Sequence, residues 1–176
     1  FLNKEKVLNI KNRSNRILLK LYNSLNFSNS YFCHRDYHAD NLMKIGNKIG
    51  IIDSQDAIIG NPAYDLVSLI DDVRIKTSYK LKSKVYRYYL QKTFKNNINN
   101  QKKFLEDFNI LSVQRSLKII GIFSRLYIRD NKKKYLKLIP YTWKLLEMRM
   151  KAEYFLELKK IFKDNIPEKI RKNTEL

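Results

Sequence analysis

The chain has 176 residues, of which 44% are hydrophobic, and a formal net charge of +19. It is long enough for one domain or one lobe of a larger enzyme, and too apolar for general disorder. A single cysteine, Cys33, excludes an internal disulfide framework and any multi-cysteine zinc site. Because no run of about 18 apolar residues exists, we expect no transmembrane helix, no membrane partner and a cytoplasmic location.

The apolar pattern predicts a mainly helical chain. Apolar residues recur three or four positions apart over most of its length, which is typical of helices with one buried face. The predicted helices cover residues 4–25, 61–74, 79–94, 104–128, 135–150 and 152–162. The fifth of these contains Pro140, which should break it or start a new helix there.

One small β-hairpin is predicted between the first two helices. Gly46, Asn47 and Lys48 supply its turn, because Gly and Asn tolerate the backbone conformations of tight hairpins. The predicted segments of this region are a turn at 26–30, an apolar run at 31–33, strands at 42–45 and 49–52, and a loop at 53–60.

The charge is unevenly distributed along the chain. Seven of its ten Asp lie between His34 and Asp72, where only three basic residues accompany them, so this segment carries −4 and the remainder +23. An acidic segment is poorly suited to bind nucleic acid and well suited to bind a divalent metal. The wealth of Lys, Asn and Ile, which A+T-rich codons favour, accounts for the basic remainder. A basic nucleic-acid-binding module stays open as the alternative from another class.

The stretch HRDYHADN, residues 34–41, contains residues that suit phosphoryl transfer. That reaction needs a carboxylate near the acceptor hydroxyl and oxygen ligands that hold Mg²⁺ against the donor phosphates. Asp36 and Asn41 are five residues apart, and Asp53 follows twelve residues later, just after the predicted hairpin. We predict Asp36 as the base or orienting carboxylate and Asn41 and Asp53 as Mg²⁺ ligands. The alternative is that all three only cap turns or the strand end.

HRDYHADNLM resembles the catalytic loop H-x-D-x-x-x-x-N that protein kinases share with aminoglycoside phosphotransferases. A protein kinase would continue with DFG and a long activation segment, but IIDSQDAIIGNPAYDL reaches a new helix about ten residues after Asp53. This form is similar to the aminoglycoside phosphotransferase superfamily. PAYDLVSL, DDVR and QRSLKIIGIFSRLYIRD further resemble the bacterial cell-wall recycling sugar kinases, which phosphorylate the anomeric hydroxyl of N-acetylmuramate and N-acetylglucosamine.

The resemblance implies an α+β, mainly α fold, the C-terminal lobe of a protein-kinase-like enzyme with a small catalytic hairpin. It implies ATP as phosphoryl donor, Mg²⁺ as cofactor and a sugar acceptor from peptidoglycan recycling, with an aminoglycoside or choline-type alcohol kinase as the alternative. No glycine-rich strand–loop–strand and no candidate nucleotide Lys precede His34. We therefore expect the N-terminal lobe to be absent from this chain, so that the chain alone lacks the ATP clamp.

The resemblance also suggests roles for other residues. The candidate substrate contacts are Asp40, Gln55, Asp56 and Arg115, with turn capping or loop-fixing hydrogen bonds as the alternative for the first three. Structural roles are expected for His34 and Asp65, an ion pair among Asp71, Asp72 and Arg74, and a buried inert thiol for Cys33. We expect a single domain, residues 1–176, with the catalytic loop and hairpin at 31–60, a helical remainder at 61–164 and a tail at 165–176.

Overall fold

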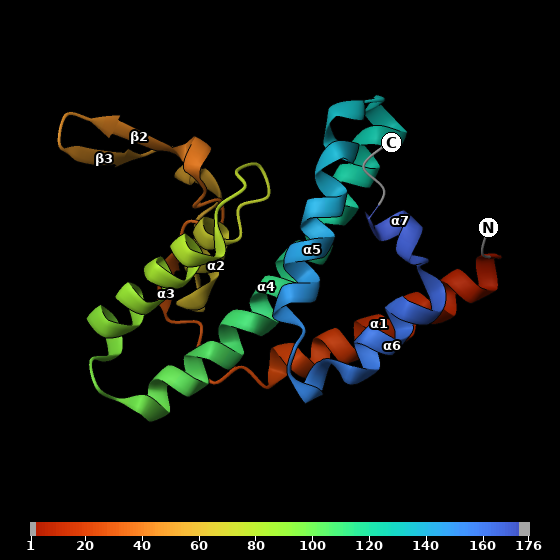
Figure 1. The fold of residues 1–176 in the computed structure, drawn as a ribbon, viewed down its shortest axis with the longest axis horizontal. Coiled ribbons are helices and arrows are strands. Elements are labelled where there is room, and N and C mark those ends of the chain that lie inside the picture. The colour runs from red at the N-terminus through yellow and green to blue at the C-terminus, as the bar shows by residue number, and fades with distance from the viewer. Residues whose placement is uncertain (1–2, 173–176) are drawn as a thin grey trace. The chain divides into compact units, whose positions relative to one another are not determined.

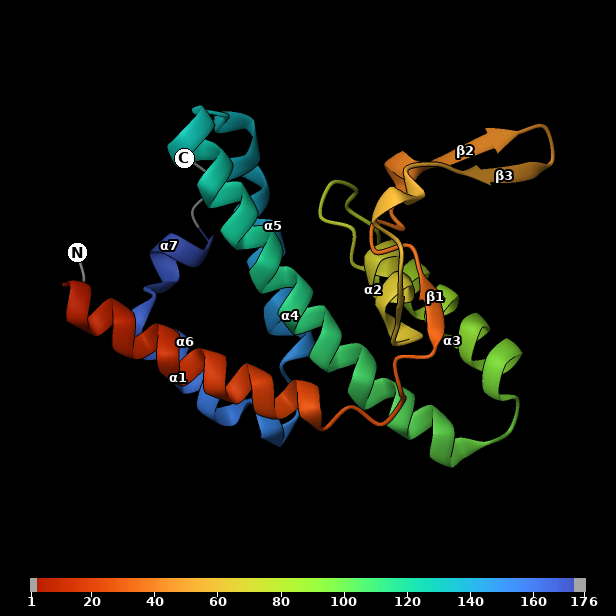
Figure 2. The same cartoon turned by 180° about the vertical axis from the view of Figure 1, so that it is seen from behind.

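Helices make up most of the chain in the structure, a computed structural model that describes residues 3–172 (Figure 1, and from behind Figure 2). The helices are α1 (Lys4–Asn23), α2 (Ala63–Ile70), α3 (Tyr79–Phe94), α4 (Ile98–Asp130), α5 (Ile139–Arg149), α6 (Leu156–Asn165) and α7 (Glu168–Lys172). Four short strands accompany them, so the predicted α+β, mainly α class is confirmed. The assignment to a C-terminal lobe stays a prediction. No helix within residues 3–172 is long and apolar enough to cross a bilayer.

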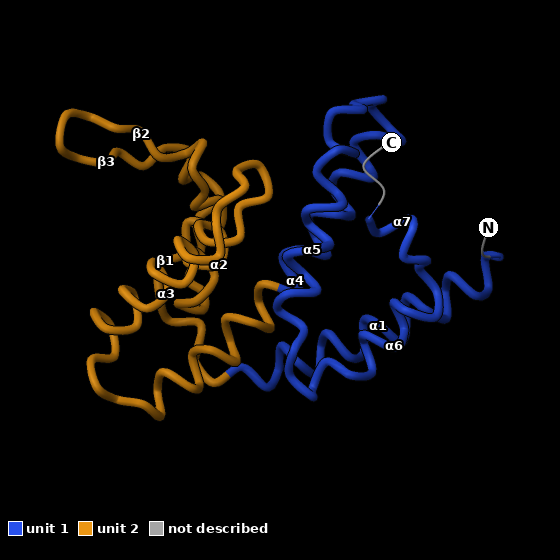
Figure 3. The backbone as a smooth tube through the Cα atoms, viewed as in Figure 1, with its two compact units in different colours: residues 1–25, 113–176 blue, residues 26–112 orange. Residues whose placement is uncertain are grey.

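The residues group into two compact units, one of residues 1–25 and 113–176 and the other of residues 26–112 (Figure 3). Helix α4 contributes residues to both units. We describe each unit by itself, and the single domain expected from the sequence stays a prediction.

The first unit is built from helices. Helix α1 contacts α6, and both bury apolar side chains, among them Leu21 of α1 and Phe162 of α6. The Phe162 ring meets Trp143 of α5 edge-on, with 5.4 Å between ring centroids. Pro140 lies in the first turn of α5, where a missing N–H costs no hydrogen bond, and a 3₁₀ segment at Lys133–Leu138 precedes it. The predicted break at Pro140 is therefore confirmed.

The second unit carries all four strands in two antiparallel pairs. Strand β1 (Tyr31–Cys33) pairs with β4 (Ile58–Gly60), and β2 (Leu42–Ile45) pairs with β3 (Lys48–Ile51). The predicted hairpin is thus confirmed to within one residue. Gly46 turns it with φ +58°, a conformation that glycine adopts without strain.

The prediction of a loop over residues 53–60 was wrong at its end. Strand β4 has only three residues, Ile58–Gly60, which is too short for a periodic signal, and its pairing with β1 is a long-range contact. Gly60 suits this pairing because a Cβ atom there would lie 3.1 Å from the Cys33 Sγ.

The helices of the second unit pack around aromatic residues. Phe104 and Phe108 of α4 are fully buried, and Tyr89 of α3 stacks on Phe104 with 5.2 Å between ring centroids. The bounds predicted for α3 are confirmed. Helix α4 begins six residues before the predicted position, since the Asn97 side chain accepts the N–H of Asn100 at 3.0 Å and caps the first turn.

Candidate active site

Residues 34–41, the catalytic loop, follow directly after β1. The Asp65 carboxylate, from the first turn of α2, accepts the backbone N–H of His34 at 2.7 Å and that of Arg35 at 3.0 Å. The His34 ring is buried, and its Nε2 lies 2.9 Å from the carbonyl oxygen of Ile52. His34 and Asp65 thus connect β1, α2 and the end of the hairpin, and the structural roles expected for them stay predictions.

Arg35 turns the chain sharply just before Asp36. Its φ is +71°, in the left-handed region that residues with a side chain adopt at a cost. Hydrogen bonds compensate, because Asp65 holds the N–H of Arg35 and the Ser68 hydroxyl lies 3.4 Å from its carbonyl oxygen. Helix α2 therefore fixes the direction in which the chain enters the rest of the catalytic loop.

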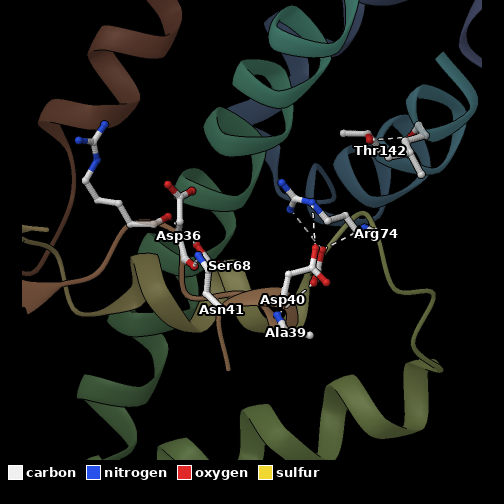
Figure 4. Close-up of polar contacts among 10 residues, drawn as sticks. Asp36, Ala39, Asp40, Asn41, Ser68, Arg74 and Thr142 are labelled. Atoms are coloured by element: carbon white, nitrogen blue, oxygen red, sulfur yellow. Dashed lines mark hydrogen bonds and ion pairs between the residues drawn. The ribbon is translucent and has the colours of Figure 1, made fainter. Parts of the chain in front are cut away.

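Asp36 and Asn41 lie in the same turn (Figure 4). The side-chain Nδ2 of Asn41 donates to the backbone carbonyl of Asp36 at 2.9 Å, and the N–H of His38 donates to the same carbonyl at 2.9 Å. Asn41 is buried, while the Asp36 side chain is half-buried. Because the nitrogen of the Asn41 amide serves the loop itself, its oxygen is the end that could bind a cation.

Asp53 follows the hairpin and also has a left-handed backbone, with φ +67°. Its carboxylate is exposed, and its Oδ1 accepts the Nε2 of Gln55 at 2.6 Å. The backbone carbonyl of Asp56 accepts the Arg35 guanidinium at 3.3 Å. These are loop-fixing hydrogen bonds, the alternative open for Gln55 and Asp56, and their contact with an acceptor stays a prediction.

The candidate metal ligands are of the right chemical type for Mg²⁺. Within residues 3–172, no group of three His, Cys, Asp or Glu is placed to hold a metal ion. Mg²⁺, however, commonly takes only one or two protein oxygens and fills its remaining positions with water and substrate phosphates. The free amide oxygen of Asn41 and the exposed carboxylate of Asp53 fit that requirement, so Mg²⁺ would be held together with the nucleotide.

Two other candidate substrate contacts lie in different surroundings. Asp40 is exposed, and its Oδ2 pairs with the Nε of Arg74 at 3.5 Å (Figure 4). Arg115 is buried on α4 and belongs to the other compact unit. The acceptor contacts predicted for Asp40 and Arg115 therefore stay predictions.

The sequence reading missed Asp107, a fully buried residue of α4. Its carboxylate accepts the backbone N–H groups of Asn26 at 2.8 Å and Phe27 at 3.0 Å, and the side chain of Asn61 at 2.8 Å. It thereby ties together the segments that lead into β1 and α2. The sequence contains a signal for this role, because Asp107 lies on the apolar face of its helix beside Phe108. A carboxylate buried there without a hydrogen-bond partner would be destabilising.

Cys33, at the end of β1, is buried as predicted, with 2% of its surface exposed. Its thiol donates to the carbonyl oxygen of Asn61 at 3.2 Å. Burial, assisted by the negative charge of Asp65, raises the pKa of the Cys33 thiol to about 11. The thiol therefore stays protonated at neutral pH and has a packing role beside the catalytic loop.

Comparison with known proteins identifies the family. The model of the phosphotransferase enzyme family matches residues 5–94, which is just over half of the chain and includes the catalytic loop and α2. The chain belongs to this family. The resemblance inferred from the HRDYHADN and PAYDL motifs is thereby confirmed.

Several curated relatives carry the name N-acetylmuramate/N-acetylglucosamine kinase. The one from Caulobacter vibrioides is 33% identical over 80% of this chain and 39% of its own length. Those from Neisseria meningitidis and Pseudomonas aeruginosa are 38% and 34% identical, over 62% and 66% of this chain and 34% and 35% of their own lengths. The chain therefore spans well under half the length of the curated relatives that it matches.

Proposed function

We propose that the full-length protein containing this chain transfers the γ-phosphoryl group of ATP to a hydroxyl of a small sugar. The observation that carries the proposal is the turn in which the Asn41 amide donates to the Asp36 carbonyl at 2.9 Å. This bond holds Asp36, with its half-buried carboxylate, close to Asn41, with its amide oxygen. Phosphoryl transfer requires such a carboxylate as the base and such an oxygen as a metal ligand. Membership of the phosphotransferase family supports the same reaction.

Each candidate site residue has a defined task in this proposal. Asp36 accepts the proton of the acceptor hydroxyl or aims that hydroxyl at the γ-phosphorus. Asn41 and Asp53 hold Mg²⁺, which neutralises charge on the donor phosphates when it is bound. Asp65 and His34 keep the loop backbone in place, through the hydrogen bonds to His34 N–H and to Ile52.

We propose the anomeric hydroxyl of an N-acetylated amino sugar as the acceptor. The names of the relatives, which specify N-acetylmuramate and N-acetylglucosamine, support this choice, as do the motifs PAYDLVSL and DDVR. Acceptor specificity depends on side chains beyond the catalytic loop, for which Asp40, Gln55, Asp56 and Arg115 are our candidates.

ADP release by the full-length protein tests both parts of this proposal. N-acetylmuramate and N-acetylglucosamine are compared with kanamycin and choline at equal concentrations, with Mg-ATP present. We expect release that depends on either amino sugar and on Mg²⁺. Release with kanamycin or choline alone would contradict the acceptor while leaving the kinase proposal standing. No release with any of the four would contradict the kinase proposal itself.

A further inference from the structure

Helix α2 and the residues just after it hold both ends of the catalytic loop. At the start of the loop, Asp65 accepts the backbone N–H groups of His34 and Arg35. At the far end, the Oδ2 of Asp72, two residues beyond α2, accepts the N–H of Ala39 at 3.3 Å. Two carboxylates from one short segment thus restrain the backbone on either side of the candidate base.

Asp72 is a buried carboxylate, with 3% of its surface exposed, and two groups of Arg74 also interact with it. Its Oδ1 accepts the backbone N–H of Arg74 at 3.0 Å and lies 3.8 Å from the Arg74 Nη1. The Arg74 Nε in turn lies 3.5 Å from the Oδ2 of Asp40, so the guanidinium bridges the two carboxylates (Figure 4). Without this bridge, the charge on Asp72 would be buried with backbone donors alone.

The bridge acts on the two residues that precede Asn41. Ala39 and Asp40 open the 3₁₀ turn that ends in Asn41, and the N–H of Asn41 donates to the carbonyl of His38 at 3.0 Å. Holding Ala39 by its backbone and Asp40 by its side chain leaves this turn little freedom. Asp72 and Arg74 therefore restrain the backbone turn that carries Asn41.

We propose that Asp72 and Arg74 are positioning residues for phosphoryl transfer, which act by orienting Asn41. The inference rests on the proposed function, in which Asn41 binds the metal. Neither residue needs to touch the reacting atoms. Residues that orient a metal ligand in this way typically change metal affinity or activity by about 10–100-fold when they are replaced.

The test uses the full-length protein and compares Arg74→Gln, Arg74→Lys and Arg87→Gln. Arg87, an exposed residue of α3, is the matched control. Mn²⁺ binding in the presence of ADP is measured by electron paramagnetic resonance, alongside kcat, KM and Tm. We expect Arg74→Gln to weaken Mn²⁺ binding about 10-fold or more and to lower kcat similarly. Arg74→Lys keeps the charge but not the planar fork, so it should fall between Arg74→Gln and wild type.

Unchanged Mn²⁺ affinity in Arg74→Gln overturns the inference, even if its Tm falls, because a purely structural role would lower Tm and leave the metal site intact. If Arg74→Gln does not fold, Arg74→Lys decides, and wild-type Mn²⁺ affinity in that variant overturns the inference. A wild-type protein that binds no Mn²⁺ with ADP and phosphorylates no sugar overturns the proposed function, and this inference with it. The two failures are therefore distinguishable.

Discussion

Hydrogen bonds fix the backbone of Asp36, while its carboxylate is available to meet a substrate. Its carbonyl oxygen accepts the Asn41 side chain and the N–H of His38, while its side chain is half-buried. A fixed backbone with an available carboxylate suits a group that must meet the acceptor hydroxyl at a defined place. The two left-handed residues nearby, Arg35 and Asp53, show that this part of the chain accepts backbone strain to hold its geometry.

We expect Asp36→Asn in the full-length protein to lower kcat by about 10²–10⁴-fold and to leave ATP binding and Tm nearly unchanged. The amide preserves the size of the side chain but cannot accept the hydroxyl proton. ADP release at saturating sugar gives kcat, and calorimetry gives ATP affinity. Asp164→Asn, at an exposed position of α6, is the matched control. A variant that keeps half or more of the wild-type kcat would show that Asp36 has another role.

The thiol of Cys33 gives a prediction about pH. Burial raises its pKa from 9.0 to about 11, so the folded state favours the neutral thiol. That preference stabilises the folded chain below pH 9 and is lost as pH rises through about 11. At pH 8 we expect iodoacetamide to alkylate the native protein at least about 100-fold more slowly than the protein in denaturant, because the thiolate is the nucleophile. Equal rates in the two states would mean that Cys33 is accessible and ionised.

At the scale of elements, α2, α3 and α4 meet at a buried ion pair. Lys82 of α3 donates to the carbonyl of Ile70, at the end of α2, and lies 3.4 Å from the Oδ1 of Asp71. The hydroxyl of Ser112, on α4, donates to the other oxygen of Asp71 at 2.7 Å. Both charged residues are buried, so each helps to compensate the charge of the other.

We expect Lys82→Met to lower the free energy of unfolding by about 3–5 kcal/mol, since it removes a cation that lies beside the buried Asp71 carboxylate. Lys84→Met, at an exposed position of the same helix, should change it by no more than about 0.5 kcal/mol. Urea unfolding of each variant gives these values. The double variant Lys82→Met/Asp71→Asn should recover part of the loss, and a loss as small as that of Lys84→Met would contradict the importance of the pair.

Elements with long local signals were predictable from the sequence. Helix α3 has a Ser78 cap and sixteen periodic residues, and both of its ends were predicted. The start of α4 was not, because Asn99, Asn100 and Gln101 in its first turn give no apolar period, and β4 was missed because it exists only through its pairing with β1. Local pattern thus predicts an element whose apolar residues recur at a regular spacing, and fails for a polar helix start or for a strand that a distant segment stabilises.

The residues of the candidate site likewise divide into those that the sequence predicted and those that only the folded chain revealed. Asp36, Asn41 and Asp53 could be named because the chemistry requires their residue types at that spacing. The contact of Asp72 with Ala39 spans 33 residues, and that of Asp107 with Asn26 spans 81. No local pattern reports such pairs, so the residues that hold the loop emerged only from the folded chain.

At the scale of the whole molecule, exposed apolar side chains concentrate on the four strands. Phe32 and Ile59 on one strand pair are 68% and 64% exposed, and Ile45 and Ile49 on the other are 62% and 61% exposed. An isolated pair of strands has only marginal stability. Exposed apolar faces of this kind are typical of surfaces that another part of a protein covers.

The last prediction concerns ATP. No glycine precedes Gly46, so the segment before the catalytic loop has no glycine-rich turn to cover phosphates. We therefore expect the isolated chain to bind Mg-ATP with a Kd above about 1 mM, a standard free energy weaker than about −4 kcal/mol.

Calorimetry on the isolated chain and on the full-length protein tests this expectation, with circular dichroism to verify that the isolated chain is helical. The full-length protein should bind at least about 10-fold more tightly, a difference of about 1.4 kcal/mol that residues outside this chain would supply. A micromolar Kd for the isolated chain would place the nucleotide site within residues 1–176. In that case the expected need for residues outside this chain, rather than the role of the catalytic loop, would need revision, since Asn41 and Asp53 belong to the chain in either case.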